Sequence, residues 1–273
     1  MLLQENYVLS NGNPIPKIAL GTWQVKGDDV VFAVKTAIKL GYRHIDTAAA
    51  YGNEKEVALG IKESGVAREE IYITTKIPAE IKSYEGAKQS IEDSLRYLDT
   101  DYIDLMLIHC PQPWDVFNEP DAYKYYDENV AVWRAMEEAY EAGKLKAIGI
   151  SNFRIPDMEN LLKHVKIRPH ANQISIHIGR TPMDWIEYCK KEDMLVMSYA
   201  PNATGILAND KRVCAMAEKY GVSVPQLGSR YNLQLGTLPL PRSKQEAHIK
   251  ENAALDHFTI TDEDMAYLIS LVE

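Results

Sequence analysis

The stretch Ile103-Asp104-Leu105-Met106-Leu107-Ile108 decides the fold, because every residue in this short run except one is apolar. A short run rich in Leu and Ile is typical of a strand that is buried on both faces, as strands of a parallel sheet are. Seven further short runs have a similar character, at residues 18–20, 44–46, 71–75, 145–150, 171–174, 195–198 and 237–240. We therefore expect eight strands.

Helical patterns separate the predicted strands. Apolar residues recur every three or four positions, which is the spacing of one helix face, in two stripes: Ala87, Ile91, Leu95 and Leu98, then Val130, Trp133, Met136 and Tyr140. Residues 183–192 and 213–220 also predict helices. Strands alternating with helices over about 250 residues predict an α/β fold, a closed (β/α)8 TIM barrel. An open doubly wound sheet is the alternative, but no G-x-G-x-x-G motif follows an early strand.

Three segments lie outside the repeated units. Residues 7–16 predict an N-terminal β-hairpin with its turn at Asn11-Gly12-Asn13, which could close the bottom of the barrel. Residues 111–127, rich in proline and aromatic residues, are longer than most loops between a strand and a helix, so we expect them to form a pocket wall. Residues 262–271 predict a C-terminal helix. Since no linker interrupts the chain, we expect a single domain over residues 1–273.

The overall charge and composition exclude several classes of partner. The 30 basic and 39 acidic residues give a net charge of −9, which disfavours nucleic acid. No run of 18 apolar residues predicts a membrane span, and the first residues do not resemble a signal peptide. Three distant cysteines without a C-x-x-C pair are typical of free thiols in a reducing compartment. We expect a cytoplasmic, monomeric protein whose partner is a small molecule.

Four polar residues fall at the carboxyl ends of three successive predicted strands. Asp46 ends the second strand, Tyr51 follows in the next loop, Lys76 ends the third strand and His109 ends the fourth. Each residue alone has an ordinary explanation, such as a helix cap, a packing tyrosine, a solvated lysine or a near-core histidine. Because the active site of such a barrel is built at this end of the strands, the four together predict a catalytic site.

The four side chains suit one kind of chemistry. A phenol has a pKa of about 10, and a nearby ammonium is expected to lower it. Asp46 could keep Lys76 charged and oriented, while His109 could orient a carbonyl oxygen beside the phenol of Tyr51. Such a proton donor suits the reduction of a carbonyl group, for which a hydride source is still required.

Seven blocks of sequence resemble the signature blocks of the aldo-keto reductases. They match in order and spacing from about Gly21 to Asn252, and the bacterial members similar to 2,5-diketo-D-gluconate reductases fit best. The blocks are HIDTAAAYGNE (44–54), ITTKIP (73–78), LIHCP (107–111), AIGISNF (147–153), NQI (172–174), SYAP (198–201) and PRSKQEAHIKEN (241–252).

The resemblance implies an NADPH-dependent reductase of aldehydes or ketones and assigns its residues. Tyr51 would be the proton donor, Lys76 would modify its pKa, Asp46 would pair with Lys76, and His109 would orient the substrate. The residues implied for the cofactor are Gly21, Thr22, Ser151, Asn152, Gln173, Tyr199, Pro201, Arg242, Ser243, His248, Glu251 and Asn252. Those implied for the substrate pocket are Trp23, Cys110 and Trp114, and no metal is implied.

Some of the cofactor residues also have structural explanations. Ser151 and Asn152 could cap a helix over residues 156–162, and Gln173 could be an interior barrel residue satisfied by a neighbour. Tyr199 could simply pack beside the proline that follows it.

Several positions depart from the pattern of the family. His248 stands where an arginine is usual, so we expect a weaker contact with the 2′-phosphate of NADPH and hence some use of NADH, with a basic surface remaining near Arg242 and Lys244. Cys110 replaces a usual tryptophan, and Trp114 or Phe117 could refill its place. The altered sequence after Tyr199 predicts pyrophosphate contacts made mainly by backbone N–H groups. A short C-terminal segment predicts an open pocket.

Two other functions fit parts of the pattern, and a third is disfavoured. A non-catalytic sensor of the cofactor could share this fold, although a sensor has no need of a tuned phenol. An aldolase or lyase could form a Schiff base on Lys76, provided that the amine is not paired with Asp46. A metal hydrolase is disfavoured because the histidines lack the spacing of metal ligands.

Overall fold

Eight parallel strands close into a barrel in the computed structural model, which describes residues 1–272. The strands pair in the order β10-β9-β8-β7-β6-β5-β4-β3. A parallel bridge between Gly21 and Arg242, with a hydrogen bond of 3.0 Å from Gly21 N to Pro241 O, joins the first strand to the last. The predicted (β/α)8 barrel is therefore confirmed. The barrel strands are β3 (Leu20–Gly21), β4 (His44–Asp46), β5 (Tyr72–Ile77), β6 (Leu105–Ile108), β7 (Ile148–Ser151), β8 (Ala171–Ser175), β9 (Leu195–Tyr199) and β10 (Leu238–Leu240).

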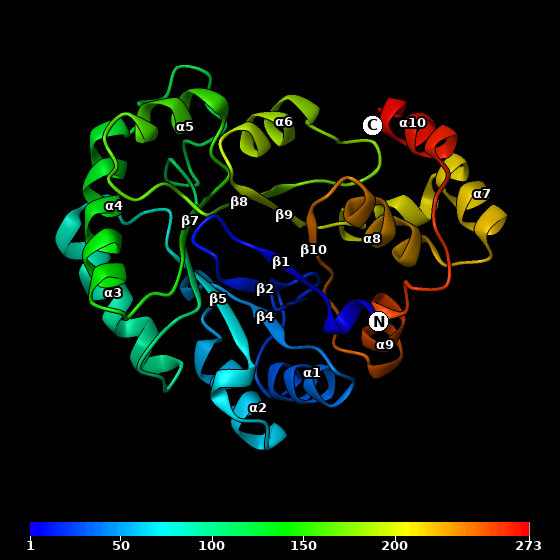
Figure 1. The fold of residues 1–273 in the computed structure, drawn as a ribbon, viewed down its shortest axis with the longest axis horizontal. Helices are drawn as coiled ribbons and strands as arrows, with labels where there is room; N and C mark the ends of the chain where they lie inside the picture. The colour runs from blue at the N-terminus through cyan, green and yellow to red at the C-terminus, as the bar shows by residue number, and fades with distance from the viewer. Residues whose placement is uncertain (273) are drawn as a thin grey trace.

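Helices surround the barrel (Figure 1). The α-helices are α1 (Asp28–Lys39), α2 (Glu54–Ser64), α3 (Tyr84–Tyr97), α4 (Tyr126–Glu141), α5 (Ile155–Leu162), α6 (Met183–Lys191), α7 (Lys211–Tyr220), α8 (Val224–Gln234), α9 (Glu246–Ala253) and α10 (Asp262–Ser270). The short 3-10 helices are η1 (Leu2–Gln4), η2 (Ala49–Tyr51), η3 (Arg68–Glu70) and η4 (Ala203–Asn209).

The strand β6 begins two residues later than the sequence predicts. Asp104 Oδ2 accepts a hydrogen bond of 2.9 Å from Ile73 N and a second bond from Arg68. The Asp104 carboxylate therefore accepts the bond that a backbone carbonyl of β6 would accept in regular strand pairing. Pairing between β5 and β6 starts only at Leu105. Ile103 still forms an isolated bridge with Leu145.

The N-terminal hairpin closes the bottom of the barrel. Strands β1 (Asn6–Val8) and β2 (Pro14–Pro16) pair antiparallel, and Figure 1 shows them crossing in front of the barrel strands. Leu9 and Ile15 belong to the same buried cluster as Leu105 of β6 and Leu238 of β10. The hairpin thus fills the interior below the site, as predicted.

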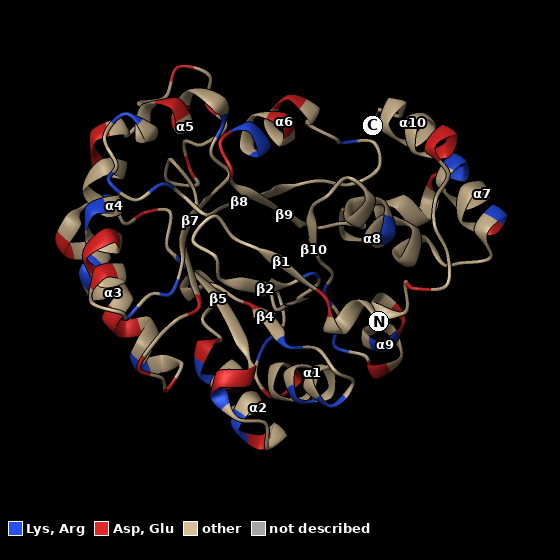
Figure 2. Ribbon diagram, in the orientation of Figure 1, with Lys and Arg blue, Asp and Glu red and all other residues tan. Residues whose placement is uncertain are grey.

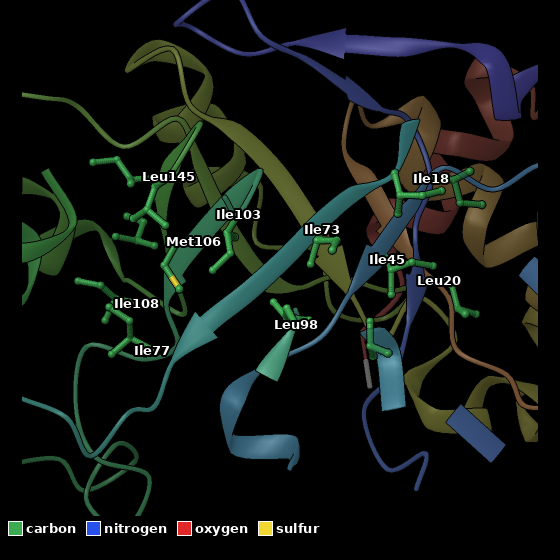
Figure 3. Close-up of a cluster of buried hydrophobic side chains, with 14 of the residues drawn as sticks. Ile18, Leu20, Ile45, Ile73, Ile77, Leu98, Ile103, Met106, Ile108 and Leu145 are labelled. Atoms are coloured by element: carbon green, nitrogen blue, oxygen red, sulfur yellow. The ribbon is translucent and has the colours of Figure 1, made fainter. Parts of the chain in front are cut away.

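A second apolar layer lies between the barrel and its helices. Ile45, Ile73 and Met106 come from three neighbouring strands and are drawn together in Figure 3. They are completely buried against the helices, because successive side chains of a strand point to opposite faces. The alternate residues on the same strands therefore point into the barrel, and Asp46 and Lys76 are among them.

Charged residues are concentrated on the outer helices (Figure 2). The few charged side chains in the strands are consequently exceptional, and those at the carboxyl ends of β4 and β5 are the ones that matter below. Within residues 1–272, no helix is both long and apolar enough to cross a membrane.

Candidate active site

A buried ion pair lies at the carboxyl ends of β4 and β5. Lys76 Nζ donates 2.7 Å hydrogen bonds to Asp46 Oδ1 and to the backbone oxygen of Thr47. The two charged residues are 0% and 3% exposed. Burial lowers the pKa of Lys76 and raises that of Asp46, and their mutual attraction opposes both shifts. The pair is thus a dry, neutral unit with a fixed geometry.

Tyr51 lies over this pair at the end of η2. Lys76 Nζ is 5.3 Å from the centroid of the Tyr51 ring. Burial raises the pKa of the Tyr51 phenol, and the charge of Asp46 raises it further. Lys76 directs its hydrogen bonds to Asp46 and to the backbone of Thr47, so its positive charge opposes the effect of Asp46 on the phenol. That Lys76 lowers the pKa of Tyr51 stays a prediction. The phenol is held in its protonated form.

His109 completes the group from the end of β6. Its ring is 5.7 Å from the Tyr51 ring, in an edge-on arrangement. Burial lowers the pKa of His109 to about 3, with Lys76 as a smaller cause, so the imidazole is neutral. Within the described residues, its Nδ1 is buried without a hydrogen-bond partner. A buried polar atom without a partner is costly, which makes this imidazole a candidate to bind a polar atom of a ligand.

Polar side chains continue the site across β7, β8 and β9. Asn152 adopts a left-handed conformation (φ 62°) and donates to the backbone oxygen of His109 at 2.9 Å. Its Oδ1 accepts from the Tyr199 hydroxyl at 2.9 Å, and Ser151 Oγ donates to Gln173 O at 2.8 Å. The alternative that Ser151 and Asn152 cap the next helix is wrong, because Arg154 is the N-cap residue of α5.

Gln173 links these polar residues to the ion pair. Its Nε2 donates 2.7 Å to Asp46 Oδ2, across the barrel interior. Part of its amide is therefore satisfied inside the barrel, which matches the structural alternative for this residue. With this bond, both oxygens of the Asp46 carboxylate accept a hydrogen bond, Oδ1 from Lys76 and Oδ2 from Gln173.

The residues of β7 to β9 fit a nicotinamide ring. A hydroxyl, two carboxamides and a phenol supply both donors and acceptors, which an amide substituent requires. The half-buried Tyr199 ring adds a flat surface beside them.

The remaining predicted cofactor residues lie around the rim. Arg242 donates to Trp23 O at 3.1 Å, and its guanidinium lies 5.7 Å from the Trp23 ring. Within residues 1–272 it forms no ion pair with a carboxylate, so its charge is available to an anion. Lys244, by contrast, pairs with Asp29 at 2.8 Å, which weakens the basic surface expected there.

Other predicted residues are placed more variously. Gly21, Thr22 and Pro201 are buried, and Thr22 Oγ1 donates to Asp46 O at 3.0 Å. Ser243 accepts from Gln245 N in the turn before α9. On α9 itself, three residues differ in exposure: His248 is exposed, Glu251 is half-buried and Asn252 is buried.

An aromatic wall borders His109. The Trp114 ring lies edge-on to His109 at 5.2 Å and to Phe117 at 5.9 Å, and Arg154 lies over the Phe117 ring. Cys110 is completely buried, and its place in the pocket wall stays a prediction.

Sequence reasoning missed two buried polar residues beside Tyr51. The sequence predicts no role for Asn53 and Glu54, although they are only 2% and 3% exposed. The available signal was their place in the same block as Asp46 and Tyr51. The metal-site alternative gains no support, because residues 1–272 contain no group of three His, Cys, Asp or Glu side chains that could hold an ion.

Several known proteins are similar to this chain in both sequence and fold. The profile of the Aldo/keto reductase family matches residues 17–273. A glyoxal reductase of Bacillus subtilis is 41% identical over 264 residues, covering 96% of this chain and 91% of that protein. The structure of an aldo/keto reductase from Brucella melitensis superposes with a TM-score of 0.90 at 36% identity, covering 98% of each chain.

A third relative was solved with a bound nucleotide. The aldo-keto reductase of Bombyx mori in complex with NADP has a TM-score of 0.86 and 33% identity, covering 97% of this chain and 92% of that one. The narrower resemblance to 2,5-diketo-D-gluconate reductases stays a prediction. Because the family profile matches most of the chain and the relatives are similar over nearly its whole length, the chain belongs to the aldo/keto reductase family of NAD(P)H-dependent oxidoreductases.

Proposed function

We propose that the protein reduces the carbonyl group of a small aldehyde or ketone, with NADPH as the reductant and Tyr51 as the proton donor. The observation that carries the proposal is the buried Asp46–Lys76 pair, which holds its cation 5.3 Å from the Tyr51 ring centroid and beside a neutral His109. The family supplies the reaction class, and the glyoxal reductase of B. subtilis supports small dicarbonyls as test substrates.

Tyr51 and His109 divide the work on the carbonyl oxygen. A neutral imidazole can donate one hydrogen bond, so His109 orients the oxygen toward the phenol. Tyr51 then gives its proton as negative charge develops on that oxygen. Its raised pKa keeps the proton in place until an alkoxide, a stronger base, has formed. Lys76 balances the charge of Asp46, which would otherwise raise the phenol pKa still further.

NADPH, when bound, supplies the hydride. We propose that Ser151, Asn152 and Gln173 hold its carboxamide, that Tyr199 stacks on its nicotinamide ring, and that Arg242 contacts the 2′-phosphate. Tyr199 donates to Asn152, and Asn152 donates to the backbone of His109, so the proposed cofactor residues are tied to the catalytic histidine. This link would hold the two reactants at a fixed separation.

A Schiff base on Lys76 is less well supported. Its Nζ is completely buried and donates to two oxygens at 2.7 Å. An amine must be free and deprotonated to attack a carbonyl, and Asp46 favours the ammonium. The structure therefore offers this nitrogen no approach to a substrate.

The substitution Tyr51→Phe tests the proposal. We expect NADPH oxidation with glyoxal, methylglyoxal or glyceraldehyde to fall about 10²- to 10⁴-fold, the range that general acid catalysis supplies. NADPH affinity, measured by fluorescence titration, should stay within about threefold of the parent, because the phenol has no proposed contact with the 2′-phosphate. Near-parental turnover in Tyr51→Phe would refute the assignment of the proton donor.

A further inference from the structure

Asn53 fastens the Tyr51 loop, residues 47–53, to the end of β3. Its Nδ2 donates 3.1 Å bonds to Thr22 O and Val25 O, and its Oδ1 accepts from Thr47 Oγ1 at 2.7 Å. Asparagine at the N-cap of a helix usually bonds the first turn of that helix. Asn53 is the N-cap of α2, yet its side chain makes no capping bond. Its amide is used instead to connect two loops of the site.

Glu54, the first residue of α2, connects the chain directly after this loop to β5. Its Oε1 accepts a hydrogen bond of 2.6 Å from Thr75 Oγ1. An acidic residue in the first turn of a helix is usually exposed and interacts with the helix dipole. Glu54 is instead 3% exposed, and burial raises the pKa of its carboxyl group. A buried carboxyl is costly unless it is hydrogen-bonded, so its partner on β5 is structurally important.

These two contacts surround the proton donor. Tyr51 stands two residues before Asn53, and Thr75 is the immediate neighbour of Lys76 on β5. Thr75 points outward from the barrel while Lys76 points inward, because the two alternate on one strand. The Glu54–Thr75 bond therefore joins the segment that carries the phenol to the strand that carries the ammonium, without touching either group.

We propose that Asn53 and Glu54 are positioning residues that fix the Tyr51 phenol relative to Lys76 and His109. This inference rests on the proposed role of Tyr51 as the proton donor. The contact acts through hydrogen-bond geometry and not through the charge of Glu54, since Thr75 needs only an acceptor. Loss of the contact should therefore slow the chemical step and leave cofactor binding unchanged, because a small misplacement of a reacting group has a large effect on rate.

The test compares threonine variants on one strand. Thr75→Val removes the hydroxyl but keeps the shape of the side chain, and Thr75→Ser restores the hydroxyl. Thr74→Val is the matched control, because the Thr74 hydroxyl makes a buried bond of 2.8 Å with His44 Nε2 and none with the Tyr51 loop. The backbone oxygen of Thr74, which accepts from Thr47 N in that loop, is kept in the variant. Glu54→Gln keeps an acceptor oxygen without the charge. For each variant, stopped-flow single turnover of NADPH with methylglyoxal, NADPH affinity and Tm are measured.

We expect Thr75→Val to slow single turnover about tenfold, with NADPH affinity unchanged. Thr75→Ser, Glu54→Gln and Thr74→Val should stay within about twofold of the parent, although both valine variants should lower Tm. Equal slowing in Thr74→Val and Thr75→Val, or no slowing in Thr75→Val, would overturn the inference. If Tyr51→Phe kept its activity, the proposed function itself would fail, so the two failures can be told apart.

Discussion

The two ends of the proposed NADPH site are built in opposite ways. Around Asp46 and Lys76, the polar contacts are buried, Lys76 Nζ has two partners, and each oxygen of the Asp46 carboxylate has one. Around Arg242 and His248, the side chains are exposed, and the bonds of Arg242 go to a backbone oxygen and to Gln24. The first region is fixed in geometry, whereas the second can adjust to its ligand.

This difference shows where chemistry and affinity are located. Preorganised groups in a dry site act most strongly on developing charge, so the buried end should control the rate of the chemical step. The guanidinium of Arg242 carries a permanent charge that can bind a phosphate through charged hydrogen bonds, so the rim should control cofactor affinity. The predictions that follow separate these two quantities.

The largest effect is expected at Lys76. Lys76→Met leaves the Asp46 carboxylate buried without its cation, so we expect turnover to fall about 10²- to 10⁴-fold and the free energy of unfolding to fall by about 3–5 kcal/mol. The double variant Asp46→Asn/Lys76→Met should regain much of the stability but none of the activity. Urea unfolding and steady-state kinetics measure both; recovery of activity in the double variant would contradict the role of the pair.

An intermediate effect concerns pH. Because the pKa of His109 is about 3 and not the usual value near 6.5, its imidazole stays neutral from pH 8 down to pH 5.5. The single-turnover rate should therefore show no acid limb in this range. His109→Gln should lower the rate about tenfold at every pH, since it weakens the orientation of the carbonyl. An acid limb near pH 6.5 that disappears in His109→Gln would show that His109 titrates during the reaction.

The smallest effect is expected at His248. His248 is exposed and its imidazole carries no permanent charge, so His248→Ala should change kcat/KM for NADPH by less than about threefold. His248→Arg should raise the preference for NADPH over NADH, because it adds a permanent charge at the rim. Steady-state kinetics with both cofactors measures the preference. A large loss with NADPH in His248→Ala would mean that this position already binds the phosphate.

Most of the barrel was predictable because each strand is marked by a short apolar run in its own sequence. The run at residues 103–108 and the other strand runs are short and apolar, and each falls on or beside an observed strand. The strand boundaries were less predictable. Regular pairing of β6 begins only after Asp104, because the Asp104 side chain accepts a hydrogen bond from Ile73 N, which is distant in the sequence. The positions of the four catalytic candidates followed from the shared end of the strands.

The polar contacts of the site could not be predicted. Nothing in the local sequence shows that Gln173 donates a hydrogen bond to Asp46 across the barrel. Nor does it show that the Asn53 side chain bonds the backbone of another loop and does not cap its own helix. The net pKa of the Tyr51 phenol could not be predicted for the same reason. It depends on how deeply the phenol is buried and on where Lys76 directs its hydrogen bonds.

A side-by-side measurement of Tyr51→Phe and Arg242→Ala tests the central claim most directly. Single-turnover hydride transfer at saturating NADPH and the Kd for NADPH are determined for both. We predict a crossed result: Tyr51→Phe loses the rate and keeps the Kd. Arg242→Ala should keep the rate and weaken the Kd about 10- to 100-fold, as loss of a charged hydrogen bond implies. If Arg242→Ala slowed hydride transfer as much as Tyr51→Phe does, the division between a buried catalytic end and an exposed binding end would be contradicted.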